Sequence, residues 1–230
     1  MRRLVSLLAA ALLLAARSTH AQDVTFGGSV DGTIGSPFTF YNSPMPNRYQ
    51  QMYVGSQFPQ PVWIDAVRFQ NTRAVSYGTA GPIAPGNYLV RFAITDRAEN
   101  GLTADFDANV TGYSATFFSG AIVGNTLRIA GAPYLFDPSR GNLLLDVTVL
   151  SQDYVSYYGF DFSRSTTDGT SRVYNSSALP GVPSTVRTDA LGLITTFETR
   201  PYVTTPEPAT LALLAGGVGL LVVVARRRRV

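Results

Sequence analysis

The segment "NYLVRFAITD", residues 87–96, alternates apolar and polar side chains. In an extended strand successive side chains point to opposite faces, so this alternation is typical of a strand with one buried face. We therefore expect one face of this strand in a core and the other face partly in water. The apolar face holds Tyr88, Val90, Phe92 and Ile94, and the opposite face holds Asn87, Arg91 and Thr95.

The same period recurs in "GNLLLDVTVL" (141–150), "YVSYYGFDFSR" (154–164) and "LGLITTFET" (191–199). We expect further strands near "VWIDAVRF", "SATFFSGAIV" and "SRVYNSS", with Gly, Pro and Asp between them forming turns. Residues 22–201 contain no convincing helical period. The pattern predicts an all-β domain over residues 22–200, an antiparallel β-sandwich of jelly-roll-like character. A closed barrel is the structural alternative.

The first 21 residues have the three parts of a secretory signal peptide. Two arginines at positions 2 and 3 form a basic start, and an apolar run covers residues 4–16. The sequence "THA" then supplies small residues at the −3 and −1 positions before Gln22. We expect residues 1–21 to be removed, so that the mature chain begins at Gln22. A buried N-terminal helix is the alternative.

The net charge of +3 belongs to the ends of the chain and not to its body. Residues 22–205 hold 11 arginines against 14 aspartates and glutamates, with no basic cluster. A nucleic-acid partner would need such a cluster to neutralise phosphates, so we exclude nucleic-acid binding. The absence of cysteine excludes disulfides and thiolate metal sites from this chain.

The sequence "TTPEPAT", residues 204–210, leads into a stretch of 17 residues without a charge, which begins at Ala209 and covers residues 209–225. As a helix these would extend about 26 Å, the short end of what crosses a hydrocarbon core of about 30 Å. By the positive-inside rule the arginines that follow belong in the cytoplasm, which places residues 22–205 outside the inner membrane. Residues 201–205 are predicted to be an extended linker. The basic end comprises Arg226, Arg227, Arg228 and Arg229.

These three parts, in this order, resemble the PEP-CTERM protein-sorting signal of Gram-negative bacteria. The resemblance implies that Pro206, Glu207 and Pro208 are the recognition element, that residues 209–225 span the membrane and that residues 226–229 stop transfer. It also implies a partner, the membrane-embedded cysteine protease exosortase, which cleaves near the tripeptide. Segments such as "DPSRGNLLLDVTVL" are similar to poorly characterised β-rich ectodomains that precede this signal, which supports a β-sandwich and suggests no ligand.

Residues 22–205 lack the side chains that most catalytic sites need. His20, in the predicted signal peptide, is the one histidine, and there is no lysine or cysteine. This excludes Ser-His-Asp, Cys-His and Schiff-base machinery and histidine-bound metals. A carboxylate pair for glycoside hydrolysis remains, with Glu99 and Glu198 as the two glutamates of this region. We predict no enzyme, no catalytic residue and no cofactor.

The segment "ADFDANVTG" resembles the start of a calcium loop, with Asp105, Asp107 and Asn109 at alternating positions. The glycine required at the sixth position of such a loop is replaced by Val110, and the acid required at the twelfth by Thr116. We therefore expect a polar loop and predict no metal site, while the question of calcium near Asp105 and Asp107 stays open.

Two aromatic residues are candidate ligand contacts. Trp63 neighbours Asp65, and Tyr157 lies on the strand face opposite Tyr158 and Phe160. Exposed rings are the stacking surfaces of sugar-binding sandwiches, so a carbohydrate-binding module, with an exopolysaccharide as its partner, is the alternative function. We predict an exported protein with a structural or interaction role at the cell surface or in a biofilm matrix, held transiently in the inner membrane before cleavage. A glycan-active enzyme ranks third.

Overall fold

The computed structural model describes residues 22–34, 47–72, 86–122, 128–152, 160–176 and 185–202, and these ranges form an antiparallel β-sandwich. They contain no α-helix and no closed barrel, so the predicted sandwich is confirmed and the barrel alternative is wrong. The strands are β1 (Gln22–Phe26), β2 (Gly32–Ile34), β3 (Asn47–Tyr53), β4 (Val62–Phe69), β5 (Gly86–Thr95), β6 (Ser114–Ile122), β7 (Arg128–Phe136), β8 (Asn142–Gln152), β9 (Phe160–Ser163), β10 (Thr170–Ser176), β11 (Thr185–Asp189), β12 (Gly192–Leu193) and β13 (Thr195–Pro201). Short 3-10 turns are η1 (Gly55–Gln57), η3 (Asp107–Asn109) and η4 (Pro138–Arg140).

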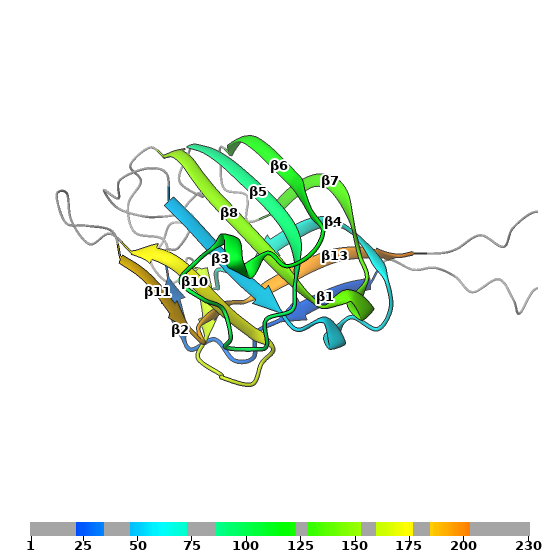
Figure 1. The fold of residues 1–230 in the computed structure, drawn as a ribbon, viewed down its shortest axis with the longest axis horizontal. Helices are drawn as coiled ribbons and strands as arrows, with labels where there is room; N and C mark the ends of the chain where they lie inside the picture. The colour runs from blue at the N-terminus through cyan, green and yellow to red at the C-terminus, as the bar shows by residue number, and fades with distance from the viewer. Residues whose placement is uncertain are drawn as a thin grey trace, which may run out of the picture.

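One layer is a six-stranded sheet in the order β11-β10-β3-β8-β5-β6 (Figure 1). Its centre is the long antiparallel pair β5 and β8, in which Phe92 lies opposite Leu145 and Val90 opposite Val147. All four residues are buried in the main core. The alternation predicted for 87–96 and 141–150 therefore places the expected apolar faces in the core.

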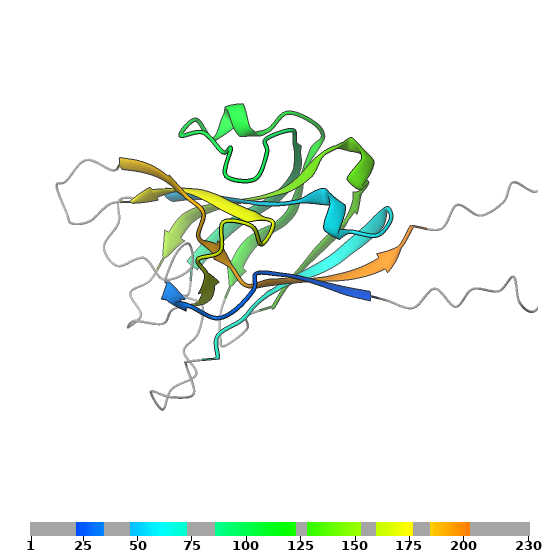
Figure 2. The same cartoon turned by 90° about the horizontal axis from the view of Figure 1, so that it is seen from below.

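The second layer is a four-stranded sheet in the order β1-β13-β4-β7. The three short strands β12, β9 and β2 form a further sheet that continues this layer. The join is made by backbone hydrogen bonds from Gln70 N–H to Ile194 O (3.2 Å), from Ile194 N–H to Asp161 O (2.9 Å) and from Asp161 N–H to Gln70 O (2.9 Å). Figure 2 shows this layer lying on one side of the six-stranded sheet.

Aromatic side chains fill the space between the two layers. The Phe197 ring of β13 is fully buried and meets the Tyr53 ring edge-on at 4.8 Å between centroids. The centroids of the Phe26, Phe58 and Phe92 rings lie 5.8–5.9 Å from the centroid of the Phe197 ring. Edge-to-face pairs at these distances are favourable, so the core is held by interlocking rings without a disulfide.

The outer face of the six-stranded sheet is less exposed to solvent than the sequence pattern predicts. The alternation of residues 141–150 places Leu144 and Asp146 on the face opposite the apolar one, where partial exposure is expected, and both are buried. The reason is that the segment between β5 and β6 folds back over this face, with η3 lying in front of β3 (Figure 1). Leu102 of this segment packs in a second small core with Met52 and Leu144. A single strand's alternation cannot reveal a cover supplied by a loop.

The predicted signal peptide (1–21) and the tail from residue 203 onward lie outside the described residues. Strand β1 begins at Gln22, the residue predicted to start the mature chain. Strand β13 extends to Pro201, and Tyr202 is still hydrogen-bonded to the domain, so the start of the predicted linker belongs to the last strand. Within the described ranges no helix is long and apolar enough to cross a membrane.

Candidate functional site at the end of the last strand

Strand β13 leads directly to the predicted sorting tail, and it lies inside its sheet between β1 and β4. Near its C-terminal end, β13 pairs with the first residue of β1, because Thr199 lies opposite Gln22. This pairing brings the two ends of the described chain side by side. The Thr199 hydroxyl donates to the Gln22 carbonyl oxygen. Gln22 and Tyr202 therefore leave the sandwich at the same end, which is the right-hand end in Figure 1. We call this the tail-side end.

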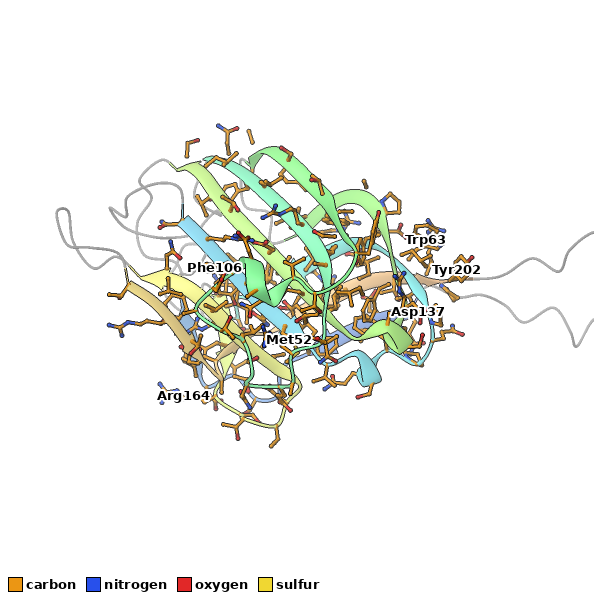
Figure 3. All side chains as sticks on the ribbon, viewed as in Figure 1. Met52, Trp63, Phe106, Asp137, Arg164 and Tyr202 are labelled. Carbon is orange, nitrogen blue, oxygen red and sulfur yellow. The ribbon has the colours of Figure 1, made fainter. Side chains whose placement is uncertain are left out.

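Tyr202 is fixed to the domain although it follows the last strand. Its backbone N–H donates to the Pro61 carbonyl oxygen at 3.0 Å. Its ring lies 6.2 Å from the ring of Trp63 on β4, at an interplanar angle of 62°. Figure 3 shows the two side chains together where the chain leaves the sandwich. The exposed fraction of Tyr202 is 42%, so this ring presents a large apolar face to the solvent.

The Trp63 ring is part-buried, and a guanidinium lies over it. The Arg200 Cζ atom is 5.2 Å from the Trp63 ring centroid, a cation–π distance. The Arg200 Nε donates to the Asp65 carboxylate at 3.0 Å. We call Trp63, Asp65, Arg200 and Tyr202 the tail-side cluster. Trp63 was predicted from the sequence as a sugar-stacking ring, and here it is one member of a cluster in which Arg200 covers one of its faces.

The rest of the outer face of this sheet carries paired charges. Arg68 and Arg128 are directly opposite each other, as are Asp23 and Glu198. Each arginine reaches across one strand to an acid, since Arg68 contacts Asp23 at 3.0 Å and Arg128 contacts Glu198 at 2.7 Å. The hydrogen bond from Arg128 lowers the pKa of Glu198 below its ordinary value. This face offers balanced charge and no free cationic or anionic patch in the described part of the chain.

A second charged cluster lies on the covered face of the six-stranded sheet. The buried Asp146 carboxylate accepts two hydrogen bonds from Arg48, at 2.9 and 2.7 Å, and one from Arg91 at 3.0 Å. Arg48 also contacts Asp107 at 2.7 Å and lies 5.2 Å from the Phe106 ring centroid. Burial opposes the charged form of Arg48, but the hydrogen bonds that it donates to Asp146 and Asp107 outweigh this effect and raise its pKa. The two arginines and the two aspartates of this cluster balance in charge. The contacts of Arg48 with Asp107 and Phe106 connect the segment between β5 and β6 to the sheet.

The candidate calcium side chains are engaged within their own loop and by β3. The Asp105 carboxylate accepts the backbone N–H of Asp107 at 3.0 Å, and Asp107 pairs with Arg48. The buried Asn109 side chain accepts from Thr103 and donates to Gln50 at 3.0 Å. Among the described residues no group of three or more His, Cys, Asp or Glu side chains could hold a metal ion. The arrangement is that of a hydrogen-bonded polar loop.

A hollow of about 350 Å³ lies between the segment that joins β5 to β6 and β11, with Asn100, Leu102 and Thr188 among its lining residues. It also borders Arg172 and Asp189, whose side chains bind each other through two hydrogen bonds of 2.7 and 2.9 Å. Because the Arg172 charge is already compensated, the hollow offers hydrogen-bonding groups without an uncompensated charge.

Several predicted site residues lie outside the described ranges: Tyr157, the tripeptide Pro206, Glu207 and Pro208, and the arginines 226–229. Sequence reasoning missed Arg200 and Tyr202 as neighbours of Trp63. Trp63 lies far along the chain from Arg200 and Tyr202, and the pairing of β13 with β4 brings it to them, with Arg200 opposite Trp63. The sole signal in the sequence was an aromatic residue, Tyr202, three positions after the predicted strand 191–199.

Residues 204–229 match the family model described as the PEP-CTERM protein-sorting motif. No curated protein and no solved structure matches the chain. The resemblance drawn from the tripeptide, the apolar stretch and the arginines is thus confirmed: the chain carries a PEP-CTERM sorting signal at residues 204–229. Such a signal marks an exported protein that transits the membrane and is sorted by an exosortase-type system.

Proposed function

We propose that this chain is a structural or interaction protein of the cell surface or the extracellular matrix. Export by residues 1–21 would be followed by transient anchoring of residues 209–225 in the inner membrane, and then by cleavage near Pro206–Pro208. The observation that carries the proposal is the family match at 204–229, which begins two residues after Tyr202, the last described residue, itself hydrogen-bonded to the sandwich. Sorting tail and folded domain are therefore joined by a very short segment.

The distance from the domain to the tripeptide suits cleavage of a folded substrate. Tyr202 and Pro206 are four residues apart, and an extended chain covers at most about 3.5 Å per residue, or about 14 Å in all. Pro206 and Pro208 bias their preceding residues towards extended backbone, the form that a protease cleft accepts. The sorting protease would thus work within about 14 Å of the folded sandwich.

A non-catalytic role is supported by the partners of the glutamates. Glu198 is engaged by Arg128 through two hydrogen bonds of 2.8 and 2.7 Å on the outer face of the four-stranded sheet. Glu99 accepts the backbone N–H of Gly169 at 2.7 Å and so closes a loop. Each glutamate has a structural partner, which argues against the two acting as the acid and base of a glycosidase.

The delivery step is tested by measuring the intact mass of the protein recovered from the cell surface. We expect a chain that begins at Gln22 and ends near Pro206. The variant Glu207→Ala should accumulate as a membrane-bound precursor that retains residues 226–229. The matched control Glu99→Ala leaves the tail intact, so its mature form should lack those arginines. Surface protein that still carries Arg226–Arg229 would instead show a permanent anchor.

Carbohydrate binding is the alternative, and the partly exposed rings of Trp63 and Tyr202 are the observation that favours it. A glycan array with the purified protein tests it directly. Saturable binding that Trp63→Ala or Tyr157→Ala abolishes would replace the structural role with that of a binding module. Incubation with polysaccharides, followed by analysis of released products, addresses the enzymatic alternative.

A further inference from the structure

We propose that the tail-side cluster is a lipid-contacting surface, which lies against phospholipid headgroups while the chain's own tail is in the membrane. The inference rests on the proposed function, because it requires residues 209–225 to be inserted. It goes beyond that function by assigning a partner to a defined surface of the folded domain. The surface consists of Trp63, Asp65, Arg200 and Tyr202.

The first argument is distance. Tyr202, which is hydrogen-bonded to Pro61, and Ala209, where the apolar stretch begins, are seven positions apart in the chain. Fully extended they cover about 25 Å, and as a flexible chain they average about 15 Å between ends. The headgroup layer on each side of the hydrocarbon is itself about 7 Å thick. The tail-side end of the domain is therefore confined to the immediate neighbourhood of the headgroups.

The second argument is orientation. The hydrogen bond from Tyr202 to Pro61 fixes the direction in which the chain leaves, and the rings of Trp63 and Tyr202 lie at that point of exit (Figure 3). Gln22 is paired to Thr199 at the same end, so a chain that still carries its signal peptide enters the membrane twice from this end. The tail after Tyr202 and the signal peptide before Gln22 therefore both direct the tail-side end towards the lipid.

The third argument is chemical. Trp and Tyr are enriched at the membrane–water interface, where a ring with one polar group matches the headgroup region. The Arg200 side chain is 49% exposed and has donors that suit a phosphate as well as the Asp65 carboxylate. The charges of Arg200 and Asp65 balance, so the surface suits zwitterionic headgroups and needs no excess of anionic lipid.

Trp63 is the one tryptophan of the chain, so its fluorescence reports this surface alone. The full-length protein is reconstituted into phosphatidylcholine vesicles, either plain or brominated near the headgroup end of the acyl chains. We expect the brominated lipid to quench Trp63 emission and the plain lipid to leave it intact. Equal emission in the two vesicles, for protein that floats with them, would overturn the proposal.

A matched control moves the single tryptophan to the opposite end of the sandwich. The variant Trp63→Phe with Leu150→Trp uses a residue that is 50% exposed on β8, and its emission should be equal in the two vesicles. Val186→Trp on β11 replaces Leu150→Trp if circular dichroism shows that the latter does not fold. Quenching of the control as strongly as Trp63 would also overturn the proposal, because the domain would then lie on lipid without preferred orientation.

Flotation separates this inference from the proposed function. Full-length protein that does not float with the vesicles lacks an inserted tail, which contradicts the transient anchoring in the proposed function. Protein that floats while Trp63 stays unquenched keeps that anchoring and refutes only the headgroup contact.

Discussion

Arg172 on β10 and Asp189 on β11 bind each other inside the sandwich through two parallel hydrogen bonds, Nε to Oδ1 at 2.7 Å and Nη2 to Oδ2 at 2.9 Å. The Arg172 side chain is only 1% exposed, and its guanidinium lies 4.5 Å from the Tyr174 ring centroid. Burial opposes the charge of Arg172, but Asp189 outweighs this effect and raises its pKa. The buried charge of Arg172 is therefore stabilised by Asp189, and this pair holds the edge strand β11 against β10.

Replacing Asp189 should therefore destabilise the fold strongly. Asp189→Asn leaves a buried guanidinium without its counter-charge, and we expect a loss of about 3 kcal/mol in the free energy of unfolding. Arg172→Met removes the charge itself and should cost less. Urea unfolding followed by circular dichroism measures both, with the exposed Arg187→Gln on the same strand as the control. A greater loss for Arg172→Met than for Asp189→Asn would contradict this explanation.

Asp146 should be the essential acid of the second charged cluster, and Asp107 should be dispensable. Asp146 is 1% exposed and accepts from both Arg48 and Arg91. Asp146→Asn removes the charge between two arginines, so we expect a loss of about 2 kcal/mol. Asp107→Asn also faces Arg48, but its side chain is 86% exposed and the urea midpoint should not move. Equal shifts for the two variants would show that burial does not set the strength of these pairs.

Phe197 should be among the costliest residues to truncate. Its ring is fully buried among the Phe26, Tyr53, Phe58 and Phe92 rings, so Phe197→Ala leaves a cavity that they cannot fill. We expect a loss of about 4 kcal/mol in the free energy of unfolding. Leu150→Ala, at a half-exposed position, should change it by less than about 0.5 kcal/mol. A small loss in unfolding free energy for Phe197→Ala would contradict this prediction and would mean that the two sheets move together to fill the cavity.

The sequence predicted the core faces of the long strands well and their outer faces poorly. The burial of Val90 and Leu145 was predicted from period-2 alternation, because the pleat of a strand decides which of its side chains share a face. Asp146 is buried because residues 96–113 cover it, and that cover depends on contacts between segments far apart in the chain. The burial of Arg172 was missed for a related reason, since its partner Asp189 lies on another strand. Strands β1, β2, β3, β7 and β11 were not among the predicted strands, and β1 and β2, with five and three residues, are too short to establish a period.

Gly131 should resist substitution because of packing between β7 and β6. A Cβ at this position would lie 2.1 Å from the Phe117 carbonyl oxygen, which is backbone and cannot swing away. We expect Gly131→Ala to force the strands apart at a cost of about 1–3 kcal/mol. The control is Gly28→Ala, where the nearest atom to a new Cβ is 3.8 Å away. Equal unfolding midpoints for the two variants would show that β7 moves freely at Gly131.

The pair of Glu198 and Arg128 should contribute stability that depends on pH. The hydrogen bond from Arg128 lowers the pKa of Glu198 from its ordinary 4.5, so the folded state holds this proton less tightly than the unfolded chain does. The pair's contribution is therefore fully present above pH 4.5 and is lost as the pH falls through the lower pKa of the folded state. Its size at neutral pH should be about 0.5 kcal/mol, because both side chains reach the solvent.

Glu198→Gln provides the measurement. The difference in unfolding free energy between the native chain and this variant should shrink as the pH falls below 4.5, and added salt should reduce it at neutral pH because exposed charges are screened. Arg128→Gln removes the same pair from the other side and should abolish the effect of Glu198→Gln in a double-mutant cycle. A difference that grows on acidification would reverse the sign and show that Glu198 binds its proton more tightly in the folded state.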